Sequence, residues 1–295
     1  MEYKTTTFYK YIDLKDPEET KGHVKGLCQG LNLLGRVLIG KEGINAGVSG
    51  RVQDIERFKE ILEKNKEFTD LTYREQASDK NTYHKLIVKT RKEIVVLNKE
   101  VDLAKKGEHI NPERLKKWME RGEKMTILDA RNDYEAELGK FKDAIVLPIK
   151  NFRDFPEEAE KALKGKEDEK IVMYCTSGIR CEKSSAYLRE KGFKKVFQLQ
   201  GGIVNYTTQF KDDNFEGSCF VFDDRLSDGI GEEDPLTNCK ICSEPSDKYL
   251  DCHNMDCDKL FICCERCQKE MNNTCSLTCK DSSRHRDMKL ELKQV

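Results

Sequence analysis

Residues 171–180 read IVMYCTSGIR, and this stretch decides the fold of the chain. The apolar run at 171–174 predicts a buried strand, and the pattern at 181–191 predicts a helix. Cys175 therefore stands between the end of a strand and the start of a helix, where backbone N–H groups and the helix dipole stabilise negative charge. That setting favours the thiolate, which is the reactive form of cysteine. We expect this segment to carry chemistry on sulfur or with sulfur.

Residues 111–210 alternate between helical and strand patterns on both sides of this stretch. Short apolar segments that alternate with helical segments are typical of a mostly parallel sheet with both faces covered. Gly192 follows the helix at 181–191 and is the expected stop of that helix. The predicted strands are 126–129, 144–147, 171–174 and 196–199, and the predicted helices are 111–121, 157–163 and 181–191.

Residues 5–97 alternate strand and helix patterns in another order. The order β-α-β-β-α-β is that of a ferredoxin-like (acylphosphatase-like) α+β domain. We therefore expect an α/β protein in three parts: residues 1–108, 109–212 and 213–295, the last an acidic tether followed by a cysteine-rich module. In the first part the predicted strands are 7–12, 35–40, 44–49, 71–74 and 86–89, and the predicted helices are 17–33 and 52–62.

The overall composition restricts the class of protein. The 295 residues are enough for two or three domains, and 36% of them are charged. The net charge of −1 neither indicates nor excludes a nucleic-acid partner, so any such binding must use a local patch. No apolar segment is long enough to span a bilayer, and the N-terminus lacks the pattern of a secretory signal. We expect a cytoplasmic protein with no membrane partner.

The cysteines are concentrated near the end of the chain, where nine of the thirteen lie between Cys239 and Cys279. Clustered cysteines in a reducing compartment indicate metal ligands, whereas small secreted proteins use them for disulfides. Eight of them are enough for two structural zinc sites of four thiolates each, and their grouping stays open. Free thiols or disulfides are the alternative. The candidate ligands are Cys239, Cys242, Cys252, Cys257, Cys264, Cys267, Cys275 and Cys279.

Four residues separate Cys175 from Arg180. Cysteine phosphatases use a loop one residue longer to surround a whole phosphate, so this shorter ring of N–H groups suits a terminal sulfur better. Gly178 permits the backbone angles of such a turn, and Arg180 adds positive charge. Cys175 and Arg180 are the candidate catalytic residues, with a buried structural cysteine as the alternative. Residues expected to support the loop or a developing oxyanion are Thr176, Ser177, Gly178, Ile179 and Asp129.

Two residues near the loop also have an ordinary explanation. Cys181 begins the helix after the loop and is a candidate resolving thiol, which would form a disulfide with an oxidised Cys175. A small buried helix residue is an equally good description of Cys181. Asp129 ends a predicted strand, and a hydrogen bond at the strand end explains it slightly better than a role in the loop.

Several motifs resemble known families. The segments at 127–135 (ILDARNDYE) and 174–202 resemble rhodanese domains, which carry a persulfide on the loop cysteine. Further motifs narrow the resemblance to the oxygen-dependent tRNA uridine hydroxylase family, which is rhodanese-related, and this resemblance covers essentially the whole chain. Ser177 departs from the family pattern, which most often has glycine there. The motifs are Gly43-Ile44-Asn45, residues 174–185, Gly201-Gly202-Ile203, FVFDDR at 220–225 and the terminal cysteines.

The resemblance implies an oxidoreductase that converts the wobble uridine of tRNA to 5-hydroxyuridine with molecular oxygen as co-substrate. It implies a rhodanese domain at 109–212 and an RNA-binding domain at 1–108, with the tRNA anticodon loop as partner. Basic residues interleaved with aromatic ones suit phosphate contact and base stacking, although a solvated strand edge explains them equally well. These candidate RNA contacts are Lys80, Tyr83, His84, Lys85, Lys89, Arg91 and Lys92.

A sulfur nucleophile is expected to activate uracil, whose C5 is itself a poor nucleophile. Addition of the Cys175 thiolate to C6 makes C5 electron-rich, and a Cys175 persulfide is the alternative working species. The sequence has no flavin or nicotinamide fingerprint, so the electron donor is unassigned. Two other functions stay open: a rhodanese-like sulfurtransferase that carries a persulfide on Cys175, and a non-catalytic, zinc-dependent adaptor that binds RNA or protein.

Overall fold

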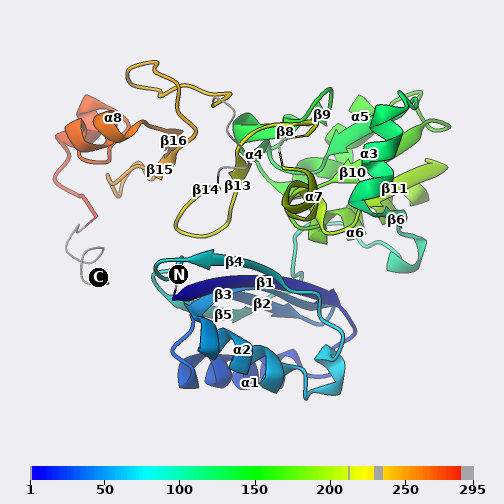
Figure 1. The fold of residues 1–295 in the computed structure, drawn as a ribbon, viewed down its shortest axis with the longest axis horizontal. Helices are drawn as coiled ribbons and strands as arrows, with labels where there is room; N and C mark the ends of the chain where they lie inside the picture. Colours follow the sequence, from blue (N-terminus) through cyan, green and yellow to red (C-terminus); the bar gives the residue numbers. More distant parts are fainter. Residues whose placement is uncertain (1, 212, 229–234, 287–295) are drawn as a thin grey trace. The chain divides into compact units, whose positions relative to one another are not determined.

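The computed structural model describes residues 2–211, 213–228 and 235–286. The chain divides into two compact units (Figure 1). The first unit holds the residues up to Val96 together with Asp223–Arg225, and the second holds Leu97–Phe222 and the described residues from Leu226 onward. No helix within the described ranges has the length and apolar character that a membrane crossing requires.

The first unit is a five-stranded sheet in the order β4-β1-β3-β2-β5. Strands β2 and β5 are parallel and the other neighbours are antiparallel. Both helices cover the same face of this sheet (Figure 1), which confirms the expected acylphosphatase-like architecture. The elements are β1 (Tyr3–Tyr11), α1 (Pro17–Gly30), β2 (Leu34–Gly40), β3 (Gly43–Arg51), α2 (Val52–Leu62), β4 (Arg74–Ser78) and β5 (Leu86–Thr90).

The core of this unit lies between the sheet and its two helices. Val24 of α1 and Phe58 of α2 are fully buried against Val37 and Val48 of the central strands. One predicted strand is displaced, since we expected it at 71–74 and β4 begins at Arg74. Leu71 is the reason, because it packs against this core with Tyr73, and pairing with β1 begins only after them.

A glycine sets the tight connection between β2 and β3. Gly43 has φ +136°, and a Cβ on it would lie 2.0 Å from the carbonyl oxygen of Lys10 on β1. A side chain there is excluded both by the backbone angle and by the neighbouring strand. The Gly43-Ile44-Asn45 motif therefore has a structural basis, which Asn45 extends by donating a hydrogen bond of 3.1 Å to the carbonyl oxygen of Ile94.

The second unit is built on a five-stranded sheet in the order β6-β11-β10-β7-β9, in which every pair is parallel. This confirms the predicted α/β domain with a parallel sheet. One short edge strand, β6, was not predicted, because its sequence Glu108-His109-Ile110 is mostly polar. The strands of this sheet are β6 (Glu108–Ile110), β7 (Thr126–Asp129), β9 (Ile145–Val146), β10 (Lys170–Tyr174) and β11 (Lys195–Leu199). A separate antiparallel pair consists of β8 (Gly139–Phe141) and β12 (Phe215–Gly217).

Helices cover both faces of this sheet. Val172 and Tyr174 on β10 share a buried cluster with Leu115 of α3 and Tyr206 of α7. Alternate residues of a strand point to opposite faces, so Met173 faces the other side, where α5 packs against α6. The helices are α3 (Pro112–Glu120), α4 (Asp133–Leu138), α5 (Phe155–Ala162), α6 (Ile179–Glu190) and α7 (Gly202–Phe210).

The last part of the second unit is small and rich in cysteine. Its hairpin of β15 and β16 shares a buried cluster with Leu138 of α4 and Phe220 of β13, so this part packs on the middle of the chain. The elements are β13 (Cys219–Phe220), β14 (Ser227–Asp228), β15 (Tyr249–Asp251), β16 (Leu260–Ile262), α8 (Glu265–Glu270) and α9 (Leu277–Lys280).

The close approach at Gly43 predicts a large cost for any side chain. Gly43→Ala should destabilise the first unit by about 2–4 kcal/mol, because the strained backbone and the overlap with Lys10 must both be relieved. Gly26→Ala is the matched control, since a Cβ at this helical position has nothing within 4 Å. It should stabilise by ~0.5–1 kcal/mol. Urea unfolding of the full chain measures both, and equal midpoints for the two variants would contradict the assignment.

Candidate functional site

The loop after β10 surrounds the sulfur of Cys175. Gly178 adopts the left-handed conformation, with φ 100°, and forms the N-cap of α6. Its backbone N–H donates to the Cys175 sulfur across 3.1 Å, and the backbone N–H of Arg180 donates to the same atom. Two backbone amides of the loop thus point at the sulfur, an arrangement that stabilises negative charge. Within the loop, Thr176 and Ser177 are half-buried whereas Cys175 is fully buried.

The surroundings of Cys175 favour its ionised form. Burial opposes ionisation, but a hydrogen bond from the Cys181 thiol, the positive charge of Arg180 and the two backbone N–H groups outweigh burial and lower the pKa of Cys175 to about 6. Burial and the neighbouring Cys175 raise the pKa of Cys181 well above its usual value. Cys181 therefore stays protonated and donates its S–H to the Cys175 thiolate.

A bidentate ion pair fixes the side chain of Arg180. Its two terminal nitrogens donate to the two carboxylate oxygens of Glu135, each across 2.6 Å, and the Glu135 side chain is fully buried. Glu135 also accepts hydrogen bonds from the backbone N–H of Asn132 at 3.1 Å and from the Thr176 hydroxyl at 3.4 Å. The carboxylate thus ties the first turn of α4 to the cysteine loop, and Arg180 braces that loop.

Sequence reasoning missed Glu135, although a local signal pointed to it. Asn132 and Glu135 form a capping box at the start of α4, which is a recognisable spacing of an amide and a glutamate three residues apart. The signal identifies a helix start, but the pairing with Arg180 depends on the tertiary fold.

A second buried ion pair lies behind the loop. Asp129, a candidate loop-supporting residue, accepts hydrogen bonds from Arg131 at 2.9 Å and 2.6 Å, and both side chains are fully buried. Arg131 also donates to the carbonyl oxygen of Gly139 across 2.7 Å. Asp129 thus holds Arg131 in place, so its contribution to the loop is the indirect one of fixing the strand end.

The Gly201-Gly202 turn lies against the other side of the loop. Gly202 has φ +66°, and a Cβ on it would lie 2.4 Å from the carbonyl oxygen of Cys175. The next residue, Ile203, donates its backbone N–H to that carbonyl oxygen across 2.9 Å. The motif therefore lets the start of α7 approach the loop backbone closely, and it fixes the carbonyl of the reactive cysteine.

The candidate RNA contacts all lie in the first unit, near β5 and the segment before it. Tyr83 is directed toward the sheet, because a Cβ on Gly47 of β3 would lie 2.4 Å from its hydroxyl. His84 places Nδ1 2.9 Å from the carboxylate of Asp224. The exposed basic members of the set are Lys80, Lys85, Lys89, Arg91 and Lys92.

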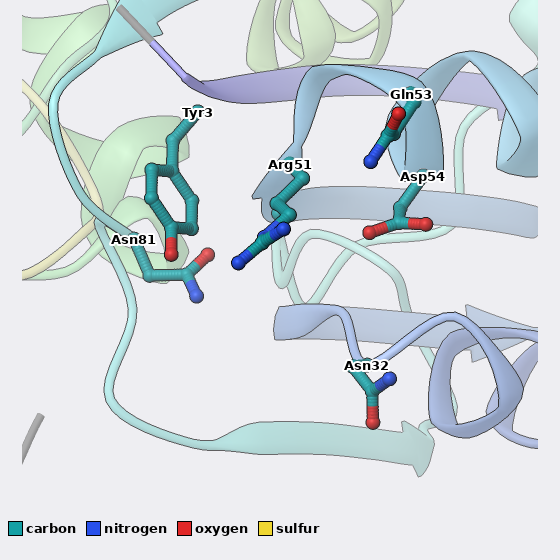
Figure 2. Close-up of a pocket in the computed structure, with 7 residues that line it drawn as sticks. Tyr3, Asn32, Arg51, Gln53, Asp54 and Asn81 are labelled. Atoms are coloured by element: carbon teal, nitrogen blue, oxygen red, sulfur yellow. The ribbon is translucent and has the colours of Figure 1, made fainter.

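The first unit also has a polar pocket of about 370 Å³. Figure 2 shows Tyr3, Asn81 and Arg51 converging on it from β1, from the segment after β4 and from the end of β3. None of the residues predicted for the site lines this pocket, and no sequence motif indicated it. The lining residues are Tyr3, Asn32, Gly50, Arg51, Gln53, Asp54 and Asn81.

The eight candidate metal ligands form two groups of four. In each group the sulfur atoms lie within 4.8 Å of one another, close to the ~3.8 Å that a tetrahedral ion with four thiolates requires. The groups interleave along the chain, because the first and third pairs of cysteines share one site and the second and fourth pairs share the other. One set is Cys239, Cys242, Cys264 and Cys267, and the other is Cys252, Cys257, Cys275 and Cys279.

Comparison with known proteins agrees with this geometry. The family models of the UPF0176 acylphosphatase like domain, the rhodanese-like domain and the "Rhodanase C-terminal" domain match residues 3–94, 111–209 and 216–280. The tRNA uridine(34) hydroxylase of Chlamydia trachomatis serovar D is 37% identical over 98% of this chain and 90% of its own length. This chain belongs to the tRNA uridine(34) hydroxylase family. Members from Chlamydia felis and Cytophaga hutchinsonii are 38% and 36% identical, covering 96% and 95% of the chain and 89% and 90% of their own lengths.

The ionised state of Cys175 predicts a low pH midpoint for its alkylation. The rate should rise with the thiolate fraction as the pH passes through about 6 and level off above, whereas an ordinary thiol titrates near ~8.5. Trypsin releases residues 171–180 as a peptide whose one cysteine is Cys175, so mass spectrometry reads this site alone. Cys181→Ala removes a hydrogen bond to the thiolate and should raise the midpoint. A wild-type midpoint near 8.5 would refute the ionised loop.

Proposed function

We propose that this family member is an oxidoreductase that hydroxylates C5 of the wobble uridine of tRNA, with molecular oxygen as co-substrate. The observation that carries the proposal is the sulfur of Cys175, which two backbone N–H groups of the loop hold in its ionised form. That sulfur lies in a chain related to tRNA uridine(34) hydroxylases over nearly its whole length. One oxygen atom of O2 enters at C5 and the other leaves as water, which requires two electrons and two protons from an external donor.

The role of the sulfur is to activate the base. Addition of a sulfur nucleophile at C6 of uracil places negative charge on O4 and makes C5 electron-rich. After oxygen enters at C5, loss of the C5 proton and departure of the sulfur from C6 restore the aromatic base. The backbone N–H groups of the loop stabilise the charge on the sulfur before addition and after departure. Arg180 contributes its charge from a fixed position against Glu135.

Burial favours the persulfide of Cys175 as the working species. The residue is fully buried, whereas Thr176 and Ser177 at the mouth of the loop are half-buried. A second sulfur bonded to the cysteine extends the reactive atom by ~2 Å, the length of an S–S bond. A persulfide therefore presents a nucleophile to the base with less movement of the loop than a thiolate needs. Cys181 fits the role of resolving thiol, because it contacts Cys175 directly.

The cysteine-rich module fits zinc. Four thiolates at tetrahedral spacing are the donor set that this ion prefers, and a site filled by four protein ligands has no open position for catalysis. We assign the two sites a structural role. None of the thirteen cysteines, all of which lie in the described ranges, forms a disulfide, and a reducing, cytoplasmic location is consistent with this. The exposed lysines near β5 suit the phosphates of the anticodon arm.

Nucleoside analysis of tRNA tests the function. Cells that lack this protein should lose 5-hydroxyuridine, and the wild-type gene should restore it. Cys175→Ser should restore at most about 1% of the wild-type level, because serine neither ionises near neutral pH nor carries a second sulfur. Cys28→Ala is the control, since Cys28 is buried in the core of the first unit. Loss of thiolated nucleosides instead would show a sulfurtransferase, and an unchanged nucleoside profile would show an adaptor.

Metal analysis tests the module separately. The purified protein should contain two zinc ions per chain, and Cys252→Ser should lower the zinc content and the unfolding temperature. Cys263→Ser should retain both ions, because Cys263 belongs to neither set although it is buried beside them. A wild-type protein without metal, or equal zinc loss in both variants, would remove the assignment.

A further inference from the structure

Phe222 is an exposed aromatic residue beside the cysteine loop. Its exposed fraction is 55%. It follows β13 and is the last residue of the segment Leu97–Phe222, which belongs to the second unit. Within the described ranges, the other large hydrophobic residues that are similarly exposed are aliphatic. Exposing a phenylalanine costs free energy, which an adjacent planar ligand would recover.

The position of Phe222 relative to Cys175 is set by one residue. The centroid of its ring lies 5.5 Å from the guanidinium carbon of Arg180. The backbone N–H of the same arginine donates to the Cys175 sulfur, and the far side of its guanidinium is held by Glu135. At this distance the guanidinium lies over the ring, and about half of the residue stays accessible to a ligand. An aromatic surface is thus presented beside Arg180, at the end of the loop.

An aromatic cluster holds Phe222 in this position. Its ring packs edge-on against Phe220, with centroids 5.1 Å apart. Phe220 packs in turn against Tyr134 at 5.3 Å and against Tyr249 at 5.8 Å. The Tyr249 hydroxyl donates to the carbonyl oxygen of Tyr134 across 2.9 Å. Tyr249 belongs to β15 and lies in the sequence between Cys242 of one set and Cys252 of the other. The cysteine-rich module therefore contributes a residue to this aromatic cluster.

We propose that Phe222 is a positioning residue that stacks on the uracil of the substrate nucleotide and holds its C5–C6 edge toward Cys175. The inference rests on the proposed function, because it takes an unpaired uridine as the ligand. Enzymes that act on a nucleobase hold it out of the helix stack between aromatic or apolar side chains. Stacking on an aromatic side chain contributes roughly 1–3 kcal/mol per base and is independent of hydrogen-bond readout. The loop itself offers amides for charge but no planar surface for the base.

The test uses the full-length protein and an anticodon stem-loop RNA with a fluorescent uridine analogue at the wobble position. Binding to the wild type should quench the analogue, because stacking on the ring changes its emission. Phe222→Ala and Phe222→Leu should each weaken binding about tenfold, or ~1.4 kcal/mol, and abolish the quenching. Phe222→Trp should retain both. Leu277→Ala is the matched control, since Leu277 is 68% exposed and lies at the start of α9.

The leucine and tryptophan variants separate stacking from simple packing. Leucine keeps an apolar side chain of similar size, so wild-type binding and quenching by Phe222→Leu would overturn the proposal. Unchanged binding by Phe222→Ala would overturn it as well. The two levels of inference fail separately. If the wild-type gene does not restore 5-hydroxyuridine, the proposed function is wrong. If it does, but Phe222→Ala binds the RNA as tightly as the wild type, only the stacking role is wrong.

Discussion

A negative charge on a buried sulfur is the constraint on which the rest of this structure depends. Two cysteines of the chain show how strong the constraint is, because both are fully buried and their pKa values move in opposite directions. Burial raises the pKa of Cys28 to about 12, whereas that of Cys175 falls to about 6. Since burial opposes ionisation at both positions, the difference arises from the groups around Cys175. These are two backbone N–H groups, the thiol of Cys181 and the guanidinium of Arg180.

Each of these groups needs its own support. The amides point inward because Gly178 takes a left-handed conformation that other residues rarely adopt. The guanidinium is a buried cation, and its desolvation is offset by the bidentate pairing with Glu135. Removal of one partner of such a pair leaves an uncompensated charge and typically costs ~3–5 kcal/mol. Each group that stabilises the thiolate is therefore itself held in place by another residue. Gly202 contributes in the same way, because its lack of a side chain leaves room for the carbonyl oxygen of Cys175.

The sequence allowed prediction of those features that depend on neighbouring residues. The strand, loop and helix around Cys175 were predictable from apolar runs and from one glycine. The spacing of the eight clustered cysteines likewise indicated that they are candidate metal ligands. Features that need the tertiary fold were not predictable in this way. The pairing of Glu135 with Arg180 joins residues 45 positions apart, and the grouping of the cysteines depends on how the chain crosses itself. The displaced strand at β4 has the same cause, because Leu71 contributes to the core and not to the sheet.

The two interleaved sets of cysteines lie in a module that packs against α4 and β13 of the second unit. Each set takes a pair of ligands from both halves of the module, so neither half can bind an ion independently and binding couples the folding of the whole module. The hairpin of β15 and β16 lies within this crossing, and its residues Tyr249 and Ile262 are buried against Phe220 and Leu138. Small modules have too few apolar residues to fix such a hairpin by burial alone. The proposed metal binding would therefore add to the rigidity with which the aromatic cluster, and through it Phe222, is held beside Arg180.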